Sequence, residues 1–241
     1  MRLFGKNPVF ERLRANPKSI KNITIQEGLP EAGAIYKKAK QWGVAVYVVP
    51  RTRMQKLSAH VNSQGVLMDV DDFEYMPYAD ILEHALEKKV TLIFLDDLND
   101  PQNLGAIIRS VSCLGHFAII LPTKDSVGVT EAVLRVASGG ENYVTIARVG
   151  NLSNAIKEAK SQGFHIVGTV VKGGINVEEC EMPYPLGLVV GSEQSGVRDV
   201  IRKHLDMEIT IPMHIDTMSM NVSQATTILC YEIAKQKHLH A

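Results

Sequence analysis

The chain has 241 residues, of which 45% are hydrophobic and 22% are charged, and its formal net charge is zero. This length suits one large domain or two small ones, and this composition is typical of a globular protein in solution. No apolar run approaches the ~20 residues that a membrane span needs, and the N-terminal segment MRLFGKNPVFERLRANP lacks the apolar core of a secretory signal.

The zero net charge conceals two halves of opposite sign. Residues 1–65 hold 12 Lys and Arg against 3 Asp and Glu, a net charge of +9. Residues 66–241 hold 14 against 23, a net charge of −9. A small basic unit joined to a larger acidic one favours a polyanionic partner for the basic unit, although a merely solvated basic surface is the simpler alternative.

The cysteines and histidines give no pattern of a metal site. Cys113, Cys180 and Cys230 are far apart and odd in number, which argues against a disulfide framework and favours three small buried hydrophobic side chains in a reducing cytoplasm. The eight histidines show no H-E-x-x-H or comparable spacing. We therefore expect a cytoplasmic protein that uses no metal.

The first predicted unit runs over residues 1–75 and is a small α/β domain. Its expected helices span residues 6–14 and 31–42 and begin again at Arg51, and its expected strands span 44–50 and 66–70. The acidic and aromatic stretch DVDDFEYMPYAD, residues 69–80, is broken by Pro77. We interpret it as the connection to a second domain, residues 76–241; a surface loop inside one larger domain is the alternative.

From Thr91 onward, apolar strands alternate with helices. Strands that are apolar throughout and separated by helices predict a mostly parallel sheet covered on both faces. A long final helix from Asn221 to about Gln236 is apolar nearly all round, which favours burial on more than one side, as in a subunit interface. The other expected strands span 91–95, 117–121, 143–147, 164–170, 186–190 and 207–211, and the other expected helices span 103–114, 130–137, 151–162 and 197–204.

Three strand-to-helix junctions of this second domain are rich in polar residues and glycine. They are Asn99-Asp-Pro-Gln-Asn103 followed by Arg109, then Gly191-Ser-Glu-Gln-Ser-Gly196, and finally Ile211-Pro-Met213 followed by Ser219-Met-Asn-Val-Ser223. Ligands of open α/β sheets bind where loops leave the carboxyl ends of strands, so three such junctions predict one composite site.

Each junction taken singly has an ordinary structural interpretation. Asn103 suits a helix N-cap, Glu193 suits the first turn of a helix, and Arg109 lies opposite an apolar stripe, as a solvent-facing arginine would. No G-x-G-x-x-G follows the first strand of this domain, and neither a P-loop nor a G-x-S-x-G elbow occurs. The residues therefore exclude the common dinucleotide, P-loop and hydrolase signatures.

In combination and in this order, the motifs resemble the SpoU/TrmH family of RNA ribose 2′-O-methyltransferases. Asn103-x(5)-Arg109, G-S-E-x-x-G from Gly191, and I-P-M followed by S-M-N-V-S-x-A form the family's three-motif pattern. The chain is most similar to the bacterial 23S rRNA (guanosine-2′-O-)-methyltransferase type, which has an N-terminal, ribosomal-protein-like RNA-binding domain. One departure is Ser138-Gly-Gly-Glu141, where the family usually has Ser-Ala-Gly-Ala.

The resemblance implies an α/β fold with a C-terminal trefoil knot, a homodimer, and S-adenosylmethionine as cofactor. It implies a catalytic group made of Asn103, Arg109, Glu193, Ser219 and Asn221, and cofactor contacts from Thr169, Gly191, Ile211 and Met220. The expected substrate is structured RNA, with a guanosine of 23S rRNA first and tRNA as an alternative. A catalytically silent RNA-binding protein of the same fold is a further alternative.

Overall fold

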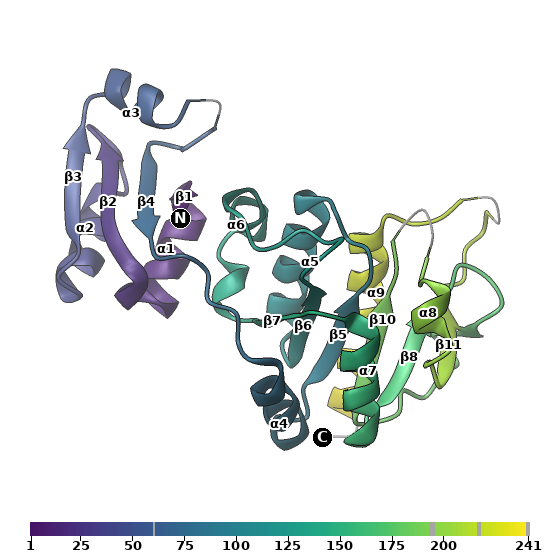
Figure 1. The fold of residues 1–241 in the computed structure, drawn as a ribbon. Helices are drawn as coiled ribbons and strands as arrows, with labels where there is room; N and C mark the ends of the chain where they lie inside the picture. Colours follow the sequence, from purple (N-terminus) through teal and green to yellow (C-terminus); the bar gives the residue numbers. More distant parts are fainter. Residues whose placement is uncertain (60, 193–195, 216–217, 240–241) are drawn as a thin grey trace.

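The computed structural model describes residues 1–59, 61–192, 196–215 and 218–239, with side chains described as far as Lys237. It contains a four-stranded sheet near the N-terminus and a seven-stranded sheet in the remainder of the chain. Figure 1 shows the two sheets as separate bodies joined by one extended segment.

The N-terminal unit is a mixed sheet with helices packed on it. Its strands have the order β1-β4-β2-β3, in which β2 and β3 are parallel and the other neighbours are antiparallel. Its core consists of side chains such as Leu13, Ile23, Ile35 and Met68. The elements are β1 (Arg2–Phe4), α1 (Lys6–Ala15), the 3-10 turn η1 (Pro17–Ser19), β2 (Ile20–Gln26), α2 (Ala32–Gln41), β3 (Ala45–Val49), α3 (Arg51–Leu57) and β4 (Val66–Val70).

The connecting segment after β4 is pinned to the second sheet. The backbone N–H of Met76 donates to the carbonyl of Ile146 at 2.9 Å, and the Tyr75 hydroxyl accepts from the backbone N–H of Val129 at 2.7 Å. The Arg148 guanidinium lies 5.7 Å from the centroid of the Tyr75 ring. Pro77 then begins a helix that the sequence did not predict, α4 (Tyr78–Lys88), because proline suits the position before the first helical turn.

The second sheet has the order β7-β6-β5-β10-β8-β11-β9, and each neighbouring pair is parallel. The prediction of an α/β fold with a mostly parallel sheet is therefore confirmed. The strands are β5 (Thr91–Leu95), β6 (Phe117–Pro122), β7 (Thr145–Val149), β8 (His165–Thr169), β9 (Ile175–Asn176), β10 (Leu186–Val190) and β11 (Met207–Thr210).

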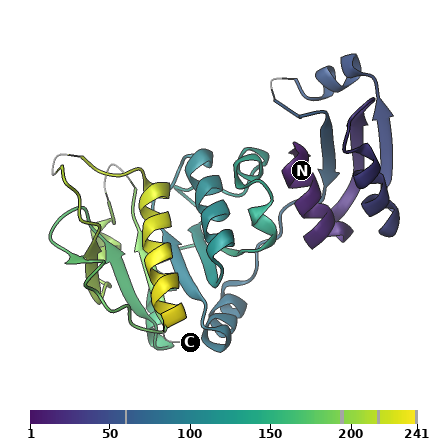
Figure 2. The same ribbon diagram turned by 180° about the vertical axis from the view of Figure 1, so that it is seen from behind.

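Helices cover both faces of this sheet. One face packs against α5 (Pro101–Leu114), α6 (Glu131–Ala137) and α9 (Val222–Leu239), and the other packs against α4, α7 (Leu152–Ser161) and α8 (Asp199–Arg202). Figure 1 shows α4 and α7 in front of the sheet, and the reversed view in Figure 2 shows α9 and α5 in front of it. Successive residues of β5 alternate between the two cores, with Ile93 in one and Phe94 in the other.

Side-chain caps lie at the starts of α5, α6 and α7. Asp100 accepts from the backbone N–H of Gln102 at 2.8 Å, with Pro101 in the first turn of α5. Thr130 caps α6 and Asn151 caps α7 in the same way. The predicted helix over residues 197–204 is shorter in the structure: α8 spans Asp199–Arg202, because Val197 is buried in the core before the helix begins.

The final helix is buried along one side and exposed along another. Leu229, Cys230 and Ile233 are almost fully buried, whereas Ile228 and Tyr231 expose 37% and 59% of their surface. No helix in the described ranges is long and apolar enough to cross a membrane.

Candidate active site

The carboxyl ends of four neighbouring strands define one edge of the parallel sheet. β10 lies between β5 and β8, and β11 follows β8. Because these strands are parallel, the loops that leave β5, β8, β10 and β11 emerge at the same edge. The polar junctions predicted from the sequence are three of these four loops.

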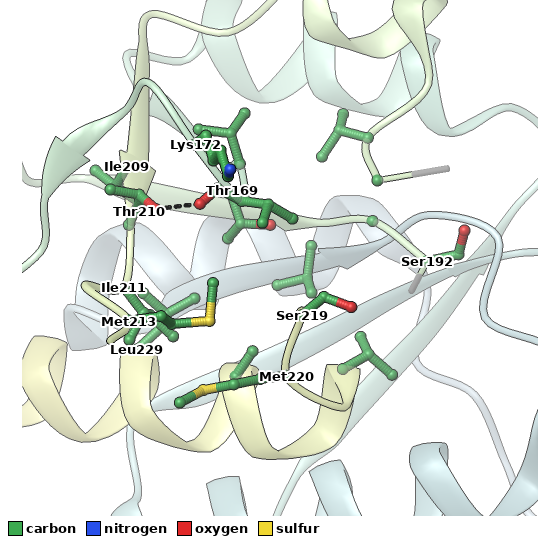
Figure 3. A pocket seen from close by; sticks show the side chains of 18 of the residues that line it. Thr169, Lys172, Ser192, Ile209, Thr210, Ile211, Met213, Ser219, Met220 and Leu229 are labelled. Carbon is green, nitrogen blue, oxygen red and sulfur yellow. Dashed lines mark hydrogen bonds between the residues drawn. The ribbon is translucent and has the colours of Figure 1, made fainter. Parts of the chain in front are cut away.

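A cavity of about 380 Å³ lies among the loops that follow β8, β10 and β11 and the start of α9. The four residues predicted to contact a cofactor, Thr169, Gly191, Ile211 and Met220, all border it, and so does Ser219. Figure 3 shows these segments converging on the cavity, and its other labelled lining residues are Lys172, Ser192, Ile209, Thr210, Met213 and Leu229. The structure thus brings together residues that are up to 60 positions apart, from Thr169 to Leu229.

Gly191 is placed where no side chain fits. A Cβ atom built on Gly191 would lie 2.0 Å from the carbonyl carbon of Gly196 and 2.2 Å from the backbone nitrogen of Val197. Gly196 has φ of 63°, a left-handed conformation that favours glycine, and its N–H donates to the carbonyl of Ser192 at 2.9 Å. The two glycines therefore let the loop fold back on itself and present backbone atoms to the cavity.

A buried carboxylate anchors the far end of the same loop. Asp96, at the end of β5, exposes 1% of its surface. It accepts from the backbone N–H of Arg198 at 3.0 Å and from the Arg198 Nε at 2.8 Å. The hydrogen bond with Asp96 raises the pKa of Arg198. Sequence reasoning missed this pair, although an aspartate placed directly after an apolar strand was an available signal.

The walls of the cavity are partly apolar and partly polar. Ile209, Met213, Met220 and Leu229 supply hydrocarbon and thioether surface. The Thr210 hydroxyl, also in the lining, donates to the carbonyl of Val171 at 2.9 Å, which joins the loop after β8 to the end of β11. Such a mixture of apolar walls and a few polar groups is typical of small-molecule sites.

The first turn of α5 meets the start of α9 through two asparagines. The Asn221 Nδ2 donates to the Asn103 Oδ1 at 2.9 Å. The Asn221 Oδ1 accepts from the backbone N–H of Ser223 at 3.0 Å and from its hydroxyl at 2.6 Å, so Asn221 also caps α9. These two predicted catalytic residues are in direct contact although 118 positions separate them.

Arg109 lies six residues further along α5, about 9 Å along the helix axis from Asn103 at 1.5 Å per residue. Its side chain is exposed, and Arg109, Asn103 and Asn221 are not among the residues that border the cavity. Glu193, the remaining predicted catalytic residue, lies outside the described residues. The structure thus assembles the predicted cofactor residues in one cavity and a pair of catalytic residues beside it, and places Arg109 on the open face of α5.

The part of the chain that the structure describes contains neither a metal site nor a disulfide. No group of three or more His, Cys, Asp or Glu side chains there could hold a metal ion. All three cysteines are free, with Cys180 and Cys230 buried and Cys113 exposed.

Comparisons with known proteins agree with this arrangement. A model of the SpoU rRNA Methylase family matches residues 90–231, and a model for RNA 2′-O ribose methyltransferase substrate binding matches residues 2–76. The chain is 34% identical over 240 residues to the 23S rRNA (guanosine-2′-O-)-methyltransferase RlmB of Neisseria meningitidis serogroup B, covering 98% of this chain and 96% of that protein.

Two further relatives extend the comparison. An uncharacterized tRNA/rRNA methyltransferase of Synechocystis is 36% identical over 201 residues, 83% of this chain but only 52% of that protein, so the match spans about half of its length. The solved structure of an AdoMet-bound rRNA methyltransferase from Sinorhizobium meliloti has a TM-score of 0.80 and 25% identity, covering 99% of this chain and 87% of that one. The family model spans more than half of the chain, and the Neisseria relative matches nearly all of it. The chain therefore belongs to the SpoU rRNA methylase family and is an RNA ribose 2′-O-methyltransferase.

Proposed function

We propose that this enzyme transfers a methyl group from S-adenosylmethionine to the ribose 2′-hydroxyl of a guanosine in 23S rRNA. The observation that carries the proposal is the convergence of Thr169, Gly191, Ile211 and Met220 on one cavity. The Neisseria relative is named for methylation of this nucleoside and supports the choice of substrate. The AdoMet-bound Sinorhizobium structure supports the choice of cofactor.

The lining of the cavity fits this cofactor. Its volume of about 380 Å³ falls within the ~300–1,000 Å³ that is usual for small-molecule sites. Met213, Met220 and Leu229 offer an apolar surface for an adenine ring. Gly191 offers backbone atoms at a place where any side chain would collide with Gly196. When bound, S-adenosylmethionine supplies a methyl group that its sulfonium centre has already activated.

The protein's own task is to align the ribose hydroxyl and to help it lose its proton. Alignment of two reacting groups can lower a barrier by ~7–11 kcal/mol at best. We assign Arg109 to gripping the phosphate next to the target ribose and to polarising the hydroxyl, because a guanidinium donates in a fixed fork. A guanidinium keeps its proton at any ordinary pH, since its pKa exceeds ~12, so Arg109 is not assigned the role of a general base.

The remaining residues of the catalytic group orient these partners. Asn103 and Asn221 hold each other through one hydrogen bond and lie at the helix ends nearest the cavity. Ser219 borders the cavity itself. We assign Glu193 to holding Arg109 or accepting a hydrogen bond from the substrate, as the family resemblance implies.

The wider organisation follows from the same proposal. We assign residues 1–75 to RNA substrate binding and residues 76–241 to catalysis, which the net charge of +9 over residues 1–65 and the match over residues 2–76 support. The exposed Ile228 and Tyr231 on α9 support a homodimer. The C-terminal trefoil knot is carried over from the family that the model over residues 90–231 identifies, and the free cysteines support a cytoplasmic location.

The second candidate function is the same reaction on tRNA, which the name of the Synechocystis relative favours. Purified enzyme should be incubated with labelled S-adenosylmethionine and either unmodified total rRNA or tRNA, followed by nuclease mapping of the label. Label at a ribose of a 23S guanosine supports the proposal, and label in tRNA with none in rRNA overturns the assigned substrate. A calorimetric titration with S-adenosylmethionine tests the catalytically silent alternative, because that alternative predicts no binding.

A further inference from the structure

The N-terminal unit contacts the second domain through a buried ion pair. Arg12, on α1, exposes 7% of its surface, and Glu141, in the 3-10 turn η2 (Gly140–Asn142), exposes 5%. The Arg12 Nη2 donates to the Glu141 Oε1 at 2.9 Å, across 129 positions of sequence. Burial raises the pKa of the Glu141 carboxyl, and Arg12 opposes that rise. A buried charge of this kind depends on its partner, because each partner left alone would be an uncompensated charge.

Glycine permits the same approach of the two units. Gly139 has φ of 97°, and a Cβ atom there would lie 2.6 Å from the Cβ of Glu11 on α1. The backbone of η2 and the surface of α1 therefore meet at a distance that no other residue type allows. The contact between α1 and η2 therefore involves both a close backbone approach and a side-chain ion pair.

Two more hydrogen bonds join the units around this point. The Tyr143 hydroxyl donates to the Glu11 Oε2 at 2.6 Å. The backbone N–H of Arg2, on β1, donates to the Glu131 Oε1 at 2.7 Å, at the start of α6. Contacts from β1 and α1 to α6, η2 and Tyr143 fix an orientation, whereas a single tether would leave the units free to swing.

The turn that receives the N-terminal unit also touches the helix that carries Arg109. A Cβ atom on Gly140 would lie 3.1 Å from the Cα of Arg109 and 2.7 Å from the Oγ of Ser112, so η2 packs directly on this turn of α5. One residue of η2 thus contacts the turn of Arg109, and its neighbour Glu141 holds Arg12. The basic unit and the helix turn that carries Arg109 therefore both pack against η2.

We propose that the Arg12–Glu141 ion pair fixes the angle between the basic RNA-binding unit and α5, so that RNA held by the one presents its ribose to Arg109 on the other. Arg12 and Glu141 are positioning residues in this scheme and touch neither RNA nor cofactor. The inference rests on the proposed function, because it assigns RNA to residues 1–75 and phosphate to Arg109.

The test uses charge reversal in the full-length enzyme. Arg12→Glu sets two carboxylates against each other, Glu141→Arg sets two guanidinium groups against each other, and the double variant restores an opposite pair. Each single variant should lower kcat on unmodified 23S rRNA by about 100-fold, as a misplacement of ~1 Å can do. The affinity for S-adenosylmethionine should stay unchanged, and the double variant should recover most of kcat.

Opposite single effects would identify a different cause. If Arg12 simply attracted RNA, Arg12→Glu would weaken RNA binding and Glu141→Arg would strengthen it, so the two single variants would change kcat/KM in opposite directions; this result would overturn the proposal. Wild-type kcat in both single variants would also overturn it. Glu83→Arg is the matched control, because it is the same charge reversal at an exposed position of α4, on the face of the sheet opposite α5.

A second readout does not depend on catalysis. Small-angle X-ray scattering should show a larger radius of gyration for each single variant than for the wild type, and the wild-type value for the double variant, with all three proteins still melting cooperatively. An unchanged radius in the single variants would overturn the docking role. An inactive wild type with this scattering pattern would contradict the proposed function and leave the docking contact supported.

Discussion

The two sides of the candidate active site consist of different kinds of groups. On the cavity side, Gly191 contributes backbone where a side chain has no room, and Met220 and Leu229 contribute apolar surface. On the α5 side, Asn103 and Arg109 contribute polar groups, one in a hydrogen-bonded pair and the other exposed. The difference indicates that ligand binding on the cavity side depends on the space left by the residues, whereas the α5 side depends on their functional groups. A change of size should therefore harm the first side, and a change of functional group should harm the second.

The largest effect is expected from adding one methyl group on the cavity side. Gly191→Ala places a Cβ atom 2.0 Å from the Gly196 carbonyl carbon, so the loop must move away from the cavity. The affinity for S-adenosylmethionine should fall by ~1,000-fold, equivalent to about 4 kcal/mol, in a calorimetric titration. Gly150→Ala is the control, because nothing lies within 4 Å of a Cβ atom there. Wild-type affinity in Gly191→Ala would contradict the claim that cofactor binding needs a residue without a side chain at this position.

A change of chemistry without loss of charge tests the α5 side. Arg109→Lys keeps one positive charge but loses the planar fork, so kcat on rRNA should fall by about 100-fold. The dissociation constant of S-adenosylmethionine should stay within about two-fold, because Arg109 does not border the cavity. Arg135→Lys, at an exposed position of α6, is the control. Near-native turnover by Arg109→Lys would refute the bidentate grip.

The anchor of the glycine loop should show an intermediate effect. Asp96→Asn keeps the shape of the side chain but removes the charge that holds Arg198. A hydrogen bond to a charged group contributes ~1.5–3 kcal/mol, so cofactor affinity should fall by about 10-fold in the same titration. Asp100→Asn, an exposed N-cap where Asn serves equally well, should leave affinity unchanged. An equal loss in both variants would show that charge near the site, rather than the anchor, is responsible.

The smallest effect is expected at the opposite edge of the sheet. The Lys237 Nζ donates to the carbonyl of Lys89 and to the Thr91 hydroxyl, and burial lowers the pKa of Lys237 to about 8. Between about pH 8 and 10.5 the unfolded chain binds more protons at this residue than the folded chain, so the free energy of unfolding should rise with pH.

Partial exposure of Lys237 reduces this rise to about 1 kcal/mol, or ~2–4 °C in Tm. Thermal melts at pH 7.5 and 9.5 on the wild type and on Lys237→Met measure it, since the variant should lack this contribution. The affinities for S-adenosylmethionine and for rRNA should remain those of the wild type. An altered cofactor affinity in Lys237→Met would contradict the expectation that this end of the sheet does not influence the cavity at the other end.

Continuous apolar runs made most strands of the seven-stranded sheet predictable, whereas a strand without such a run was missed. β5 and β10 have the predicted bounds because each is apolar throughout and buried on both faces. β2 was missed because its sequence, IKNITIQ, has no continuous apolar run, although Ile23, Thr24 and Ile25 are all buried. α4 was missed: its first three residues fell in the predicted connection, where Pro77 was interpreted as a break, and no element was predicted over the rest of the helix.

The convergence of residues on the cavity side of the candidate site could be predicted for a topological reason. Junctions after parallel strands must emerge together, so the motifs at Gly191, Ile211 and Ser219 converge without knowledge of any contact. The Asp96–Arg198 pair joins residues 102 positions apart and carries no periodic signal. Nor could sequence spacing reveal that Gly139 and Glu141, where the chain departs from the family pattern, receive a second unit.

The insertion of β10 between β5 and β8 has a consequence for synthesis on the ribosome. β5 ends at Leu95, but β10, one of its two neighbours in the sheet, begins only at Leu186, and the hydrogen-bond partner of Asn103 is Asn221. Contacts this distant in sequence form late, because the chain must close a long loop before they stabilise anything. The four-stranded sheet is complete at Val70, so a nascent chain can form its basic unit long before it has a methyl-transfer site.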